Sequence, residues 1–131
     1  HSGRWGLGAA TTSGALGVDY QHARGIDAEA VAAGALAADE HRWLTGLAGD
    51  TLRRRTTAIW CAKEAAAKAA GSGLEGRRQD WRIVAWNETP PRTQARVHHA
   101  STEYPIAVVD LDGDCLALCC DIATVHTPAI A

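Results

Sequence analysis

Residues 59–74 read IWCAKEAAAKAAGSGL and carry the strongest helix signal in the chain. Alanine dominates this stretch, and alanine has the highest helix propensity of all residues. Gly71 is placed to end the helix in a left-handed cap. Trp60, Glu64 and Lys68 are spaced four apart, so a helix aligns them along one side. On spacing alone, the simplest interpretation of Glu64 and Lys68 is a solvated ion pair on the surface.

The segments on either side of this helix predict an α+β fold. The helix extends back to Leu52, with Asp50 or Thr51 as its cap. Two shorter helices are predicted before it, capped by Asp27 and Asp39. β-prone runs predict strands at residues 5–10, 14–20, 81–86, 95–99, 106–111 and 115–122. The Asp112-Gly113 dipeptide is typical of a tight hairpin turn. We therefore expect a long helix packed on a small, mostly antiparallel sheet.

Length and charge are typical of one domain without a nucleic-acid or membrane role. The chain has 131 residues, with 13 basic and 15 acidic residues and a net charge of −2. No apolar run approaches the ~20 residues needed to span a bilayer. We expect a cytoplasmic protein with a single domain over residues 1–123 and a loose tail at 124–131. Because the chain contains no methionine, we also expect it to be a segment of something longer.

Polar residues that suit phosphate and metal chemistry gather in three places. Carboxylates with an amide oxygen suit a hard cation such as Mg²⁺, which usually also binds a substrate phosphate. Lysines beside such a metal would hold the charge of the phosphate. The residues are Asp19 and Gln21 on one face of a predicted strand, Lys63, Glu64 and Lys68 on the helix, and the glycine pair Gly71 and Gly73. Each spacing by itself is common in soluble domains.

Three separated motifs together resemble the 4′-phosphopantetheinyl transferases. They are HSGRW at residues 1–5, GVD at 17–19, and WCAKEA at 60–65 with Lys68 and a G-x-G-L run at 71–74. The family pattern reads roughly S-H-S-G-x-W, G-[IV]-D-x-E and W-[ST]-x-K-E-[AS]-x2-K-x2-G-x-G-L. Their order and their gaps both fit, and the resemblance spans residue 1 to about residue 74. The fold expected from it is a 4′-phosphopantetheinyl transferase-like α+β module.

The resemblance implies an enzyme that moves the 4′-phosphopantetheine arm of coenzyme A to a serine of an acyl carrier protein. The reaction depends on Mg²⁺ and releases adenosine 3′,5′-bisphosphate. Asp19 and Glu64 would bind the metal, and Glu64 would also help to deprotonate the attacking serine. Lys68 would steady the leaving group. Coenzyme A contacts are implied for His1, Lys63, Lys68, Gly71 and Gly73.

Two departures from the family pattern leave alternatives open. Gln21 stands where many larger members have glutamate, so a third metal ligand there brings an oxygen but no charge. The chain also resembles only the second half of the larger two-half type, as in the C-terminal domain of a polyketide synthase. A second copy or a preceding half-domain would then supply the other wall of the site. The alternative function is a non-catalytic coenzyme A-binding or assembly module of a larger synthase.

Overall fold

The computed structural model describes residues 16–74 and 77–120. The strand predicted at residues 5–10, the coenzyme A contact predicted for His1 and the tail predicted at 124–131 lie outside these ranges. The elements in chain order are β1 (Leu16–His22), the 3-10 helix η1 (Ala23–Gly25), α1 (Ala28–Ala35), the 3-10 helix η2 (Ala38–Leu44), α2 (Gly49–Ala70), the 3-10 helix η3 (Arg78–Asp80), β2 (Arg82–Thr89), β3 (Arg92–His99), β4 (Thr102–Leu111) and β5 (Asp114–Cys120).

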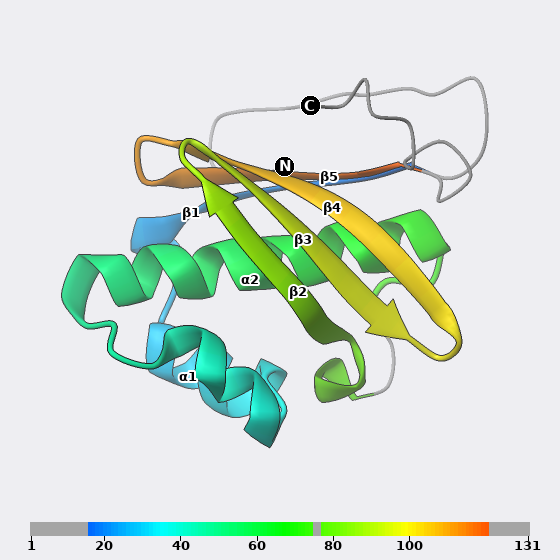
Figure 1. The fold of residues 1–131 in the computed structure, drawn as a ribbon, viewed down its shortest axis with the longest axis horizontal. Coiled ribbons are helices and arrows are strands. Elements are labelled where there is room, and N and C mark those ends of the chain that lie inside the picture. The colour runs from blue at the N-terminus through cyan, green and yellow to red at the C-terminus, as the bar shows by residue number, and fades with distance from the viewer. Residues whose placement is uncertain (1–15, 75–76, 121–131) are drawn as a thin grey trace.

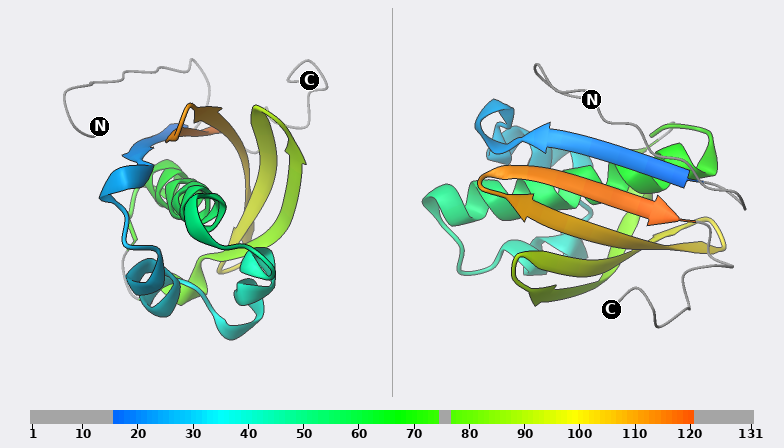
Figure 2. Two further views of the ribbon diagram at one scale, coloured as in Figure 1. Left: turned by 90° about the vertical axis from the view of Figure 1, so that its left-hand side faces the viewer. Right: turned by 90° about the horizontal axis from the view of Figure 1, so that it is seen from above.

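A five-stranded antiparallel sheet packs against the long helix α2, as the α+β prediction expected (Figure 1). The strand order is β1-β5-β4-β3-β2, so β1 and β2 form the two edges. Figure 2 shows the sheet curving around α2, with α1 and η2 on the side of α2 away from the sheet. Within the described ranges, no helix is long and apolar enough to cross a membrane.

The helix ends follow the predicted caps in two places and depart from them in two others. Gly71 ends α2 with φ of 80°, as predicted, and Asp27 caps α1 by accepting a hydrogen bond from the Ala30 amide. The caps predicted at Asp50 or Thr51 and at Asp39 are wrong. Ala48 precedes the first turn of α2. The segment around Asp39 forms a 3-10 helix rather than an α-helix. Ala37 precedes this helix, and its backbone amide donates a hydrogen bond to the side chain of Glu40.

The hairpin turns explain where the strands end. Asp112 and Gly113 have φ of 57° and 96°, the left-handed conformations that a two-residue hairpin turn requires. This turn was predicted. The strand predicted at residues 81–86 ends later than expected, because β2 continues to Thr89 and the chain reverses at Pro90-Pro91. The ladder tolerates these two prolines because they occupy the turn and not a paired strand position.

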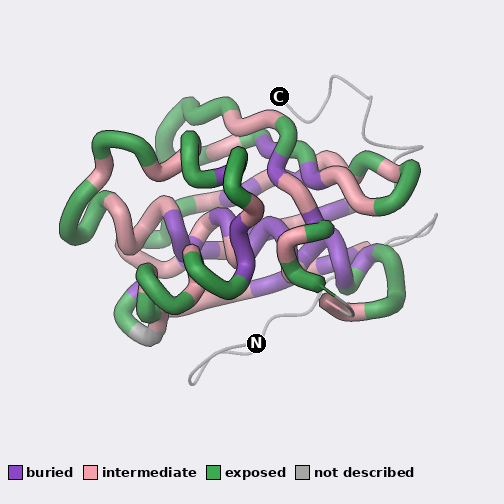
Figure 3. The backbone as a smooth tube through the Cα atoms, turned by 90° about the horizontal axis from the view of Figure 1, so that it is seen from below, coloured by how far each residue is buried: buried purple, intermediate pink, exposed green. Residues whose placement is uncertain are grey.

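The core lies between α2 and the inner face of the sheet (Figure 3). The helix contributes mostly alanines to it, and the strands contribute larger side chains such as Val97, Ile106 and Val108. Small helix residues let the sheet approach closely, so that packing does not require long side chains on both surfaces. The alanine-rich face therefore sets the distance between helix and sheet.

Gly17 is the point where β1 comes closest to α2. A Cβ atom at residue 17 would overlap the carbonyl oxygen of Ala65 and would lie 2.6 Å from the amide nitrogen of Ala69. Both of these atoms belong to the helix backbone, which cannot rotate away as a side chain can. The thiol of Cys61 adds a hydrogen bond to the carbonyl oxygen of Asp19, 3.2 Å away. Glycine at this position therefore allows the edge strand to lie directly on the helix.

A buried ion pair ties α2 to η2. Lys63 is completely buried, and its ammonium lies 2.8 Å from Glu40 and 2.7 Å from the carbonyl oxygen of Ala35. The second carboxylate oxygen of Glu40 accepts a hydrogen bond from the Ile83 amide at the start of the sheet. Burial lowers the pKa of Lys63, and the contact with Glu40 opposes that shift. The pair thus joins three separate parts of the chain.

Replacing Gly17 with alanine should destabilise the fold by at least about 2 kcal/mol, because β1 must move away from the helix backbone. Urea unfolding followed by circular dichroism measures this. The matched control is Gly34→Ala within α1, where a Cβ meets no atom within 4 Å. That change should leave stability unchanged or raise it, since alanine favours helix. Equal unfolding midpoints for Gly17→Ala and the wild type would contradict the close approach.

Replacing Lys63 with methionine should cost about 3–5 kcal/mol of stability, because it leaves the Glu40 carboxylate buried without a counter-charge. The double variant Lys63→Met with Glu40→Gln should recover part of this loss. Its amide carries no charge, and its single oxygen can accept from only one of the two backbone amides that Glu40 binds. Chemical denaturation of the three proteins tests the coupling. If the double variant is no more stable than Lys63→Met alone, the pair is not the source of the effect.

Candidate active site at the contact of β1 and α2

Asp19 occupies the middle of the contact between β1 and α2. It shares the inner face of β1 with Gly17, and only 4% of its surface is exposed. The ammonium of Lys68 lies 2.7 Å from one carboxylate oxygen and 3.2 Å from the carbonyl oxygen of Val18. The interpretation of Lys68 as the partner of Glu64 in a surface ion pair is therefore wrong. The carboxylate of Asp19 already holds a cationic group at this position.

Gln21 lies beside Asp19, as the alternation along the strand predicts. Its side-chain nitrogen donates a hydrogen bond of 2.9 Å to the second carboxylate oxygen of Asp19. This bond uses the amide nitrogen, so the amide oxygen keeps its capacity to accept. Gln21 thus holds the Asp19 carboxylate in place and adds a polar oxygen without adding charge.

Glu64 lies on the same side of α2 as Lys68, one turn earlier, and is half-buried. Burial raises the pKa of Glu64, and the nearby Asp19 carboxylate raises it further. Lys68 and Arg78 act in the opposite direction on that pKa. Two carboxylates and two cations therefore influence one another across this contact. Such an arrangement favours the binding of an additional cation between the carboxylates and of anions beside the basic groups.

Lys63 requires a correction. The side chain expected to contact phosphate is fully buried on another side of α2, bonded to Glu40 and to Ala35. An ammonium held in this way is not presented to a ligand, so the structure does not support the expected contact. Lys63 and Lys68 are five residues apart, which separates them by about 140° around the helix axis. That rotation explains why one lies in the core and the other at the site.

The glycines after α2 form its terminal turn. Gly71 and Gly73 have φ of 80° and 65°, and both amides donate to carbonyl oxygens of the last helical turn. A Cβ at either residue meets no atom within 4 Å, so the left-handed backbone, rather than lack of space, is what calls for glycine. The turn begins at Gly71, three residues after Lys68, and ends the helix there.

The residues around Asp19 fit a magnesium ion in type. Mg²⁺ is usually bound through one or two carboxylates, with water and substrate phosphates completing its shell. Asp19 and Glu64 can supply the carboxylates, and the Gln21 oxygen can bind the ion or a water on it. In the part of the chain that the structure covers, no group of three or more histidine, cysteine, aspartate or glutamate side chains could form a complete protein cage. These residues therefore fit a metal ion whose coordination shell is completed by water and by a substrate phosphate.

One residue beside this site belongs to none of the three motifs. Arg78, on η3, places its guanidinium carbon 5.3 Å from the centre of the Trp60 ring. Trp60 lies one turn before Glu64 on the same side of α2. The signal in the sequence was only a pair of arginines at residues 77 and 78. A contact between η3 and a helix residue 18 positions earlier cannot be deduced from such a pair.

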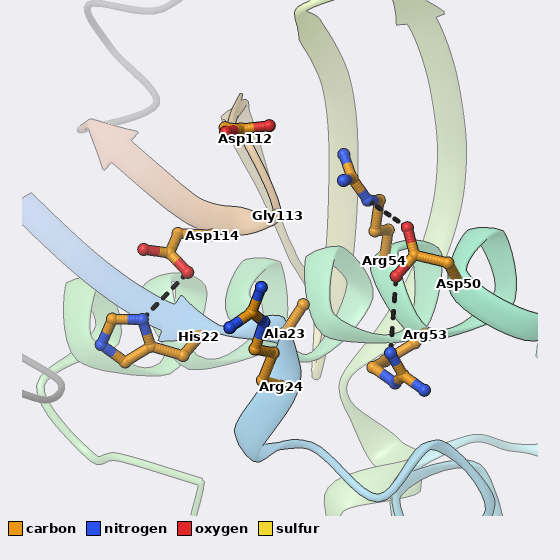
Figure 4. Close-up of a pocket in the computed structure, with 9 residues that line it drawn as sticks. All are labelled: His22, Ala23, Arg24, Asp50, Arg53, Arg54, Asp112, Gly113 and Asp114. Atoms are coloured by element: carbon orange, nitrogen blue, oxygen red, sulfur yellow. Dashed lines mark hydrogen bonds and ion pairs between the residues drawn. The ribbon is translucent and has the colours of Figure 1, made fainter.

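A pocket lies elsewhere, at the beginning of α2 (Figure 4). It has a volume of about 510 Å³, and no described residue of the predicted site lines it. Its charged side chains largely pair with each other, as Asp50 does with Arg53 and Arg54. Hydrogen bonds from Tyr20 and His22 lower the pKa of Asp114 at its edge. We therefore place the candidate site at Asp19, where the carboxylates and cations of the motifs converge.

Comparisons with known proteins bear on the fold and the family of this chain. A search of curated proteins finds no match. Among solved structures, the fold resembles a 2.31 Å crystal structure of a holo-(acyl-carrier-protein) synthase from Bacillus anthracis strain Ames in complex with CoA (3′,5′-ADP). The TM-score is 0.64 at 21% identity, over 80% of this chain and 92% of that one. The family model of the 4′-phosphopantetheinyl transferase superfamily matches residues 15–119, and the chain therefore belongs to that superfamily.

Proposed function

We propose that this protein transfers the 4′-phosphopantetheine arm of coenzyme A to a serine of an acyl carrier protein. The observation that carries the proposal is the convergence of Asp19, Glu64 and Lys68 at the contact of β1 and α2, together with membership of the superfamily. In the reaction, the serine oxygen forms a bond to the phosphorus that bears the pantetheine arm. The bond from that phosphorus to the bridging oxygen breaks, and adenosine 3′,5′-bisphosphate leaves.

The side chains of this protein have separate roles in the proposal. Asp19 and Glu64 would hold Mg²⁺, with Gln21 as an uncharged third ligand, and the ion would neutralise and orient the pyrophosphate. Glu64 accepts the proton of the serine hydroxyl, directly or through one water. Lys68 is placed to hold the developing negative charge on the leaving group. Since Lys68 bonds to Asp19 in this structure, its ammonium has to turn toward the substrate when a metal binds.

We also propose that a second surface completes the site. Among the strands of residues 16–74 and 77–120, β1 lies at an edge of the sheet, and Lys68 is 40% exposed beside it, so this part of the chain leaves the site open on one side. A second copy of the chain or a preceding half-domain would close it and hold part of coenzyme A. Light scattering of the purified protein, at several concentrations, distinguishes a monomer from an assembly. The serine substrate is proposed to arrive on the carrier protein at the same open side.

The alternative function is a coenzyme A-binding module without catalysis. The observation that favours it is Gln21, which gives this strand one carboxylate at the site instead of two. Metal-dependent binding of coenzyme A, with no mass gain of an apo carrier protein, would identify such a module. A mass gain equal to one phosphopantetheine arm identifies the transferase. A known transferase run in parallel establishes that the carrier protein is competent.

Replacing Glu64 with glutamine should lower transfer at least about 10²-fold, because it removes a metal ligand and the proton acceptor with almost no change of volume. Mass spectrometry of the carrier protein measures the rate, and circular dichroism checks the fold. The matched control is Glu103→Gln on β4, whose carboxylate makes only a long surface contact of 3.8 Å with Arg96. That variant should transfer at the wild-type rate. Full activity of Glu64→Gln would remove this residue from its role.

Replacing Gln21 with glutamate should lower the Mg²⁺ concentration needed for half-maximal transfer several-fold. A second carboxylate beside Asp19 adds charge where the amide now adds none, and charge at the ligands raises cation affinity. A magnesium titration of the transfer rate measures the shift. An unchanged titration curve in an active, folded variant would show that residue 21 does not contact the metal or its waters.

A further inference from the structure

The buried position of Lys63 leaves a shortage of positive charge at the proposed site. Lys63 is bonded to Glu40, and Lys68 is bonded to Asp19. A pyrophosphate arriving next to two carboxylates needs basic groups that can turn toward it, and arginine is well suited to this because its planar fork matches phosphate oxygens. The basic group that acts on Glu64 besides Lys68 is Arg78.

Trp60 fixes the position of Arg78. The indole ring is half-buried on α2, and the guanidinium lies over it at 5.3 Å, within the range of a cation–π contact. Because Trp60 and Glu64 are four residues apart on one helix, the ring holds the arginine on the Glu64 side. η3 supplies the arginine from a different part of the chain, just before β2. Helix and 3-10 turn together set the direction of this side chain.

The donors of Arg78 are available to a ligand. Its side chain is exposed, and among residues 16–74 and 77–120 no carboxylate forms an ion pair with it. By contrast, Arg53, Arg54, Arg55 and Arg82 each form an ion pair with an aspartate or a glutamate. The cation–π contact with Trp60 uses no hydrogen bond, so it leaves the N–H groups of the guanidinium able to donate. An exposed, oriented arginine beside a half-buried glutamate is suited to bind a phosphate.

We propose that Arg78, positioned by the ring of Trp60, binds the pyrophosphate of coenzyme A and supplies the charge expected from Lys63. The inference rests on the proposed transferase function. Arg78 is the binding residue, and Trp60 is a positioning residue that acts through it. The pyrophosphate is favoured over the 3′-phosphate, because Arg78 lies on the side of Glu64, the residue proposed to bind the metal of the pyrophosphate.

The test compares variants of both residues in the transfer assay and in calorimetric binding of coenzyme A. Arg78→Ala should raise the KM and the Kd for coenzyme A roughly tenfold or more, with a smaller effect on kcat. Arg78→Lys should recover part of the loss, since it keeps the charge but not the fork. Trp60→Phe should stay close to wild type, and Trp60→Leu should approach Arg78→Ala. The matched control Arg77→Ala, an exposed arginine one residue earlier, should change neither constant.

Repeating the assays with dephospho-coenzyme A, which lacks the 3′-phosphate, shows which phosphate Arg78 binds. A loss of the same size with this substrate supports the pyrophosphate, and a loss that disappears with it overturns that assignment in favour of the 3′-phosphate. If the wild type transfers the arm and Arg78→Ala keeps its KM and Kd, the inference fails and the transferase stands. If the wild type binds coenzyme A without transferring the arm, the comparison of Kd between the wild type and Arg78→Ala tests the role of Arg78 by itself. If the wild type does neither, both proposals fail together.

Discussion

The contact at Gly17 is the constraint on which the candidate site depends. A side chain larger than hydrogen would strike the backbone of α2 at Ala65 and Ala69, so the edge strand can lie on the helix only because of this glycine. Two residues further along the same face of β1, Asp19 then reaches Lys68 at 2.7 Å. The hydrogen bond from Cys61 to the Asp19 carbonyl oxygen fixes the strand along the helix axis. Close backbone packing is thus what makes a site from two separate motifs.

The two lysines of α2 show how burial divides similar groups between structure and chemistry. Lys63 and Lys68 each bond to a carboxylate at a distance of less than 3 Å. Lys63 is fully buried, so its charge and that of Glu40 must stay together, and the pair is a structural tie. Lys68 is 40% exposed, so its own ammonium can turn into water or toward a substrate, while the buried carboxylate of Asp19 then needs another cation in its place. Only the second lysine is free to take part in a reaction.

The position of the site at one edge of the sheet has a consequence for assembly. Among the strands that the structure describes, β1 has a hydrogen-bonded neighbour only on the β5 side, and Asp19, Gln21 and Lys68 gather along it. The pocket of Figure 4 is lined by the end of β1, the start of α2 and the turn between β4 and β5. Arg54, its lining residue nearest to Glu64 along α2, precedes Glu64 by ten residues, which is about 15 Å along the helix. The acidic and basic side chains of the pocket mostly satisfy one another. The exposed, charged side chain of Lys68 at this edge supports the proposal that a second surface completes the site.

The sequence by itself determined the α+β class, the long helix ending at Gly71, the hairpin at Asp112-Gly113 and the family, because these depend on local propensity, turn chemistry and motif spacing. It also indicated that Asp19 and Gln21 share a face, which follows from strand alternation. Only the tertiary structure decided the partners. Glu40 lies 23 residues from Lys63, and Arg78 lies 18 residues from Trp60, so neither contact leaves a periodic signal. Which lysine enters the core depends on the side of α2 that η2 covers, and that is settled by packing.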